Sequence, residues 1–257
     1  MTNSTGTGSL YARSFTNDGT IAATGGTLNL GTSAASYVFA NDPGGNITVS
    51  GASTNLQLNA PNGTYIVNQG TFSVPSGTLY TNGLLNNSTG GTLKGAGTIN
   101  GSVLVSGGTI APGNAGIGTF SFVTGALNVT NSAVFEVDLG GSTADKLSFQ
   151  NPPAAINLGA GLLALSVNLL SAPTPGSTDS LLQITAGGGG ITGWFSGLPN
   201  SGDIYTTVFN STSYYFSVNY QANLVSLSVV AVPEPPAYVL LVALASILPI
   251  LRRRWKR

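Results

Sequence analysis

The sequence predicts an all-β protein built from many short strands. Only 6% of its 257 residues are charged and 36 are Gly, whereas Val, Ile, Thr, Phe and Tyr are common. This composition favours strands that are joined by glycine turns over helices. A hydrophobic content of 42% is enough for a packed core and argues against a disordered chain.

A recurring tripeptide, Gly-Thr followed by an apolar residue, supports the same fold class. It occurs nine times, beginning at Gly19, Gly26, Gly63, Gly70, Gly77, Gly91, Gly97, Gly108 and Gly118. The spacing is irregular, so we interpret each copy as a turn glycine that starts a short strand and points its apolar residue inward. Between the copies apolar and polar residues alternate, as where Phe135, Val137 and Leu139 are separated by acidic residues.

Short strands of this kind form either a sandwich or a solenoid of stacked parallel coils. The pattern favours the solenoid for residues 1–150, because stacked Asn, Ser and Thr side chains tolerate repetition and each coil contacts only its neighbours. With coils of roughly 20 residues, this part would form about seven coils. The sandwich remains the alternative that the pattern alone leaves open.

The pattern of apolar and polar residues changes after residue 150. Leu163, Leu165, Val167 and Leu169 alternate with other residues and are expected to face inward. Residues 214–230 read as a hairpin that turns at 221–223. We therefore predict that residues 151–231 form a β-rich cap or small sandwich, which closes the open end of the solenoid.

The segment "GTLKGAGTINGSVLVSGGTIAPGNAGIGTFSF", residues 91–122, resembles the passenger-associated strand repeat of autotransporter-type surface proteins. The resemblance continues more loosely through "FEVDLGGSTADKLSF" and "GGGGITGWFSGLPNSGD", so that it covers about half of the chain. It implies a right-handed parallel β-helix that is displayed outside the cell, usually without enzymatic chemistry of its own.

The end of the chain predicts a membrane segment. Residues 237–251 carry no charge, and five of the eight basic residues follow them, namely Arg252, Arg253, Arg254, Lys256 and Arg257. A helix of this length spans about 22 Å, short of the roughly 30 Å of a bilayer core. The cations would stay on the cytoplasmic side as a stop signal and hold the body outside. The alternative is a hydrophobic C-terminal strand with a basic end.

Val232, Pro233, Glu234 and Pro235 precede the apolar segment, and prolines keep this stretch extended. With the segment and the Arg cluster they resemble the PEP-CTERM sorting signal. That resemblance implies cleavage near the motif by exosortase, a membrane-embedded enzyme of Gram-negative exopolysaccharide producers, and release to the cell envelope or extracellular matrix, with exopolysaccharide as a candidate partner. Residues 1–15 contain no signal peptide, so we expect the true start to lie upstream of Met1; a fragment is the alternative.

Charge and residue types narrow the function classes. Residues 1–231 contain three basic residues, Arg13, Lys94 and Lys146, against seven acidic ones, so nucleic-acid binding is not expected. The chain has no His and no Cys, and we expect neither a metal nor a cofactor.

Glu136 and Asp138 lie on one face of a strand, and paired carboxylates can hydrolyse glycosides. An enzyme would require a groove that gathers them with Asp145, Lys146 and aromatic side chains. We expect instead a non-enzymatic exported surface or matrix protein. A carbohydrate-active enzyme, that is a lyase or glycosidase, and a specific adhesin are the alternatives.

Overall fold

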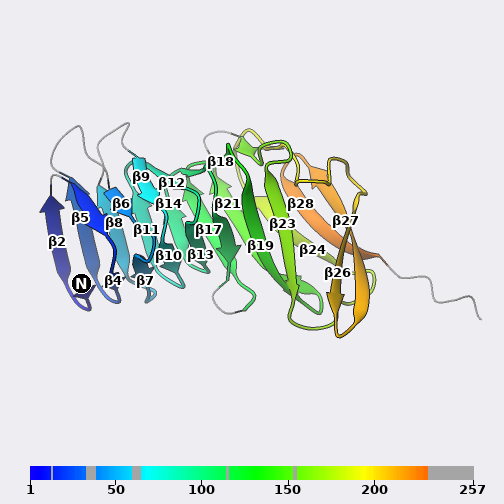
Figure 1. Cartoon of the computed structure of the whole chain (residues 1–257), viewed down its shortest axis with the longest axis horizontal. Helices are drawn as coiled ribbons and strands as arrows, with labels where there is room; N and C mark the ends of the chain where they lie inside the picture. Colours follow the sequence, from blue (N-terminus) through cyan, green and yellow to red (C-terminus); the bar gives the residue numbers. More distant parts are fainter. Residues whose placement is uncertain (13, 33–38, 60–64, 114–115, 153–154, 231–257) are drawn as a thin grey trace, which may run out of the picture.

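The protein forms a parallel β-helix, as a computed structural model shows (Figure 1). The structure describes residues 1–12, 14–32, 39–59, 65–113, 116–152 and 155–230. Within these residues every regular element is a β-strand, and no helix long and apolar enough to cross a membrane is found among them. The coils stack along one axis from the N-terminal end to a terminal group of antiparallel strands.

Three sheets form the sides of the helix, and each receives about one strand from every coil. In sheet A the strands are β1 (Thr2–Asn3), β4 (Thr20–Ala23), β7 (Asn46–Val49), β10 (Thr71–Val74), β13 (Thr92–Gly95), β16 (Thr109–Pro112), β19 (Ala133–Gly140) and β20 (Thr143–Ala144), and β23 (Leu163–Leu169) pairs with β19. Sheet B contains β2 (Thr7–Ala12), β5 (Thr27–Thr32), β8 (Asn55–Asn59), β11 (Thr78–Thr81), β14 (Thr98–Asn100), β17 (Thr119–Thr124), β21 (Lys146–Asn151), β24 (Thr178–Ile184), β28 (Leu224–Val230), β27 (Thr212–Gln221) and β26 (Ile204–Phe209). Sheet C contains β3 (Phe15–Asn17), β6 (Phe39–Asn41), β9 (Tyr65–Asn68), β12 (Leu84–Asn87), β15 (Val103–Val105), β18 (Leu127–Val129), β22 (Ile156–Asn157) and β25 (Ile191–Thr192).

The Gly-Thr-apolar tripeptides mark the corners of the coil, as predicted. In every copy that the structure describes in full, the Thr is the first residue of a strand. The copies at Gly19, Gly70, Gly91 and Gly108 start strands of sheet A, and those at Gly26, Gly77, Gly97 and Gly118 start strands of sheet B. The copy at Gly63 lies outside the described residues. The solenoid is thereby confirmed over the sandwich in this part of the chain.

In the copies that the structure describes in full, the apolar residue faces the core, where it stacks on apolar residues of the neighbouring coils. In sheet A the stack is Ile21, Ile47, Phe72, Leu93, Ile110, Phe135 and Leu165. Each of these side chains is buried. Because neighbouring strands lie about 4.8 Å apart, each side chain packs on the one above and below it. The stacked core is therefore the direct result of placing one apolar residue at the same point of every coil.

Parallel stacking continues past residue 150, where a change of structure was expected. β23 pairs in parallel with β19 from Ala133↔Leu163 to Leu139↔Leu169, and β22 pairs in parallel with β25. The inward alternation predicted for residues 163–169 is confirmed, but it belongs to another coil of the helix. The predicted hairpin is also confirmed, as the antiparallel pair β27 and β28, and this pair extends sheet B beyond β24.

The loop of residues 193–203 and the terminal strands β26–β28 close this end of the core. Phe195 is fully buried and stacks on Phe135, with their ring centroids 6.0 Å apart. The Tyr220 hydroxyl donates to the carbonyl of Leu198 at 2.8 Å and accepts from the N–H of Phe195 at 3.0 Å. These contacts hold the loop across the last coil.

Candidate functional site

A ladder of buried asparagines runs along the corner between sheets C and A. Asn17, Asn41, Asn68 and Asn87 end the successive strands β3, β6, β9 and β12, and they stand in register. Each Nδ2 donates to the Oδ1 of the next residue, at distances of 2.7, 2.8 and 2.7 Å. The last three are fully buried, so their hydrogen bonds to one another replace the water that they have lost.

The same amides also hold the following strand of sheet A. Asn41, Asn68 and Asn87 donate to the carbonyls of Thr71, Thr92 and Thr109, respectively, each one coil further on. The ladder ends at Val105, which takes the register position after Asn87. Each of these asparagines thus holds the turn of its own coil and the position of the sheet A strand in the next coil.

Glycines cover this ladder because no other residue fits above it. A Cβ on Gly91 would overlap the carbonyl oxygen of Asn68 and approach the Oδ1 of Asn87 to 2.7 Å. Gly45, Gly70 and Gly108 are crowded in the same way by the coil before them. Packing between coils therefore requires these glycines. Because they have no side chains, the surface above them is a shallow depression.

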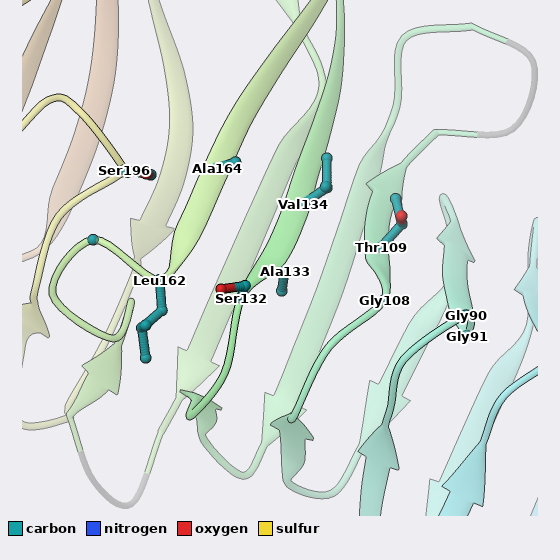
Figure 2. A pocket seen from close by; sticks show the side chains of 11 residues that line it. Gly90, Gly91, Gly108, Thr109, Ser132, Ala133, Val134, Leu162, Ala164 and Ser196 are labelled. Atoms are coloured by element: carbon teal, nitrogen blue, oxygen red, sulfur yellow. The ribbon is translucent and has the colours of Figure 1, made fainter.

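This glycine row forms the floor of a trough along the corner of the helix. One hollow of about 550 Å³ is lined by residues of the turns and starts of β7, β10 and β13, including Asn46, Gln69, Thr71 and Lys94. A second of about 410 Å³ extends toward β16, β19 and β23. Figure 2 shows the second hollow, with Thr109, Val134 and Ala164 near the starts of successive strands and the exposed Ser132 in a turn. Both hollows are lined in part by Gly90, so they adjoin, and together they are called the trough below.

A buried carboxyl group, that of Asp145, joins two segments of the chain. Asp145 is 1% exposed; its Oδ1 accepts from the N–H of Gly118 at 2.7 Å, and its Oδ2 accepts from the N–H of Asp138 at 2.8 Å. Burial raises the pKa of Asp145 to about 6, although the two backbone donors act in the opposite direction. A Cβ on Gly113 would come within 2.7 Å of this carboxylate, so Gly113 also packs closely against it.

The other candidate catalytic residues have separate places. Glu136 is exposed on the outer face of β19, as predicted, and Asp138 accepts from Nδ2 of Asn168 on the adjacent β23 at 2.7 Å. Lys146 starts β21 in sheet B. None of these residues or Asp145 lines either hollow of the trough. The structure thus does not bring the four residues together in this groove, and among the described residues no group of three or more acidic side chains is arranged to hold a metal.

The predicted sorting residues lie outside the described part of the chain. This applies to the motif Val232–Pro235, to the apolar segment 237–251 and to the cations from Arg252 to Arg257. They remain predictions from the sequence.

The ladder and the trough were not predicted from the sequence, although the sequence contains a signal for the ladder. Each ladder asparagine precedes the first residue of a sheet A strand by three to five positions, as in "NDGT", "NQGT" and "NSTGGT". Trp194, which is 39% exposed, was also missed. It lies against the trough because a Cβ on the lining residue Gly161 would be 3.3 Å from its Nε1.

A comparison of the chain with protein-family models finds no match, and a comparison with curated proteins finds none either.

Proposed function

We propose that the protein is a non-enzymatic structural protein of the cell surface or extracellular matrix of a Gram-negative bacterium. In this proposal the β-helix is right-handed, and residues 237–251 form a short helix that holds the body at the inner membrane. Exosortase then cleaves near Val232–Pro235 and releases the body. The support for sorting is the sequence of residues 232–257, in which an extended proline motif, an apolar segment and a cluster of cations follow one another.

The observation that best supports a structural role for the body is that its buried and paired polar groups bond to neighbouring segments of the chain. Asp145 is bonded to two backbone N–H groups of neighbouring segments, and Asp138 is bonded to Asn168. Asn41 and its ladder neighbours join successive coils. These groups hold the coils together, which is what a durable scaffold requires. The glycosidase alternative would need Glu136 and Asp138 to face a common substrate groove.

Fractionation of the native host, with an N-terminal signal peptide present, tests the sorting step. Replacing Arg252, Arg253 and Arg254 with Ser should weaken retention and orientation, because each cation at the bilayer centre costs about 3 kcal/mol on insertion scales. Glu234→Ala or Pro235→Ala should instead leave full-length protein in the membrane with the correct orientation. Equal release of the Glu234 and Pro235 variants and the unchanged protein would contradict the proposal.

A further inference from the structure

The two adjoining hollows of the trough together have the length of a site for an extended polymer. Its two hollows pass along the starts of six strands of sheet A, from β7 to β23. Five strand spacings of about 4.8 Å correspond to roughly 24 Å. The floor consists largely of glycines that packing between coils requires, so the trough is a fixed feature of the helix.

The trough offers side chains and not a free backbone edge. The N–H groups of Asn46, Thr71, Thr92 and Thr109 already donate to carbonyls of the preceding coil, and that of Ala133 donates to Leu162. A peptide strand that pairs by its main chain would therefore find few donors here. The available groups include the amides of Asn46 and Gln69 and the hydroxyls of Thr71, Ser132 and Ser196.

Charge argues against an anionic polymer. Lys94 lines the trough, but the described residues contain only one other lysine, Lys146, against seven acidic side chains. A polyanion such as a nucleic acid would meet a body of net negative charge. Lipid chains would need a continuous apolar lining, whereas amide, hydroxyl and ammonium groups interrupt the lining around Asn46, Gln69 and Lys94.

An aromatic side chain stands at one end of this polar row. Trp194 is packed against Gly161, and the N–H of Gly161 donates to the Trp194 carbonyl at 2.9 Å. Trp194 is 39% exposed, so an aromatic side chain with one polar N–H group lies at the surface beside Gly161, which lines the trough. A row of hydroxyl and amide groups that ends at an aromatic face matches a chain of sugar rings, which carry hydroxyls at their edges and C–H groups on their faces.

We propose that the trough binds a linear, uncharged polysaccharide in an extended conformation, with Trp194 against a sugar ring and Gln69 among the residues that bind its hydroxyls. The ligand class rests on the proposed function of a matrix protein, and it identifies the matrix component that this face would contact. The two proposals can fail separately, because sorting is read from the C-terminus of the exported protein and polysaccharide binding from the folded body.

Calorimetric titration of the full chain in detergent with linear hexasaccharides tests the inference. The probes are the hexamers of β-1,4-glucose, β-1,4-mannose, β-1,4-N-acetylglucosamine and α-1,4-glucose, with hexagalacturonate as the charged counterpart. At least one neutral probe should bind, and Trp194→Ala should weaken it about tenfold. Gln69→Ala should weaken it severalfold, and Ser132→Trp, which fills the trough at an exposed position, should abolish it.

Matched variants separate this site from a general effect. Tyr215 is 38% exposed on β27, and Gln57 lies on β8 in sheet B, so Tyr215→Ala and Gln57→Ala should leave the affinity unchanged. Melting curves establish that each variant is folded. The inference is overturned if none of the neutral hexamers binds, if the control variants weaken binding as much as Trp194→Ala and Gln69→Ala, or if hexagalacturonate binds as tightly as the neutral probes.

Discussion

The Nδ2 atom of Asn41 lies 2.8 Å from the Oδ1 atom of Asn68, and both side chains are fully buried one coil apart. The coils of this helix differ in length. The strands of sheet A begin at residues 20, 46, 71, 92, 109, 133 and 163, so a coil contains from 17 to 30 residues. The loops absorb the difference in length, while the asparagines keep the strands at a constant height. Over the coils from Asn17 to Asn87, the ladder therefore helps to keep the strands in register.

Removing one member of the ladder should destabilise the body. Asn68→Ala removes the oxygen that accepts from Asn41. It also removes the amide nitrogen that donates to Asn87 and to the Thr92 carbonyl. We expect the free energy of unfolding to fall by about 2–3 kcal/mol, because buried polar groups lose their partners. Urea denaturation measures the loss. Asn82→Ala removes an exposed amide that donates to Asn59 at 2.6 Å and should cost less than about 0.5 kcal/mol; equal losses would contradict a special role for the ladder.

The glycines above the ladder can be tested with a matched pair. Gly91 and Gly19 both start a Gly-Thr-apolar tripeptide of sheet A, but only at Gly91 would a Cβ overlap the preceding coil. Gly91→Ala should lower the free energy of unfolding by about 2 kcal/mol or more, as overpacking does. Gly19→Ala should leave it nearly unchanged, because nothing lies within 4 Å of the added atom. Comparable melting temperatures for the two variants would show that packing does not require Gly91.

The stability of the body should decrease as the pH rises from about 4 to about 6. The pKa of Asp145 is raised to about 6 in the folded chain from its ordinary value of 3.8, so over this range the folded state holds a proton that the unfolded state has released. The stabilisation is complete below pH 4 and is lost as the pH passes 6, with a change of at most about 3 kcal/mol. Burial also raises the pKa of Asp179, which acts in the same direction.

Melting temperatures measured from pH 4 to pH 7 check this dependence. Asp145→Asn cannot ionise and should flatten the curve, with a smaller slope left from Asp179. A curve for the unchanged protein that rises with pH over this interval would contradict the assignment.

The loop of residues 193–203 and the strands β26–β28, which close the end of the β-helix, should protect it against association with other molecules. Tyr220→Phe removes the hydroxyl that joins the Phe195 N–H and the Leu198 carbonyl, and we expect a loss of about 1–2 kcal/mol. Opening of the loop would expose strand edges of the last coil, so light scattering on mild heating should increase as well. Tyr215→Phe, at an exposed position on β27, is the control. Identical scattering by the two variants would argue against this role of the loop.

The strand starts could be predicted because Gly, Thr and an apolar residue recur as a local pattern, and Phe72 and Leu93 are inward as expected. The sequence supported the solenoid over the sandwich less strongly, because side chains alternate in the same way in the strands of both folds. The extent of the parallel stack could not be read from residues 163–169, because an inward-facing strand does not reveal its partner. The role of Asp145 was missed for the same reason: its partner Gly118 lies 27 positions away.

We propose that the body is exported and released by processing near residues 232–235. Mass spectrometry of the secreted and matrix fractions of the native host tests it most directly, with digestion by a protease that leaves the tail in identifiable peptides. We expect the exported protein to end at or near the motif and to lack the apolar segment with the "RRRWKR" end. Recovery of that intact C-terminal peptide from the exported protein would contradict it.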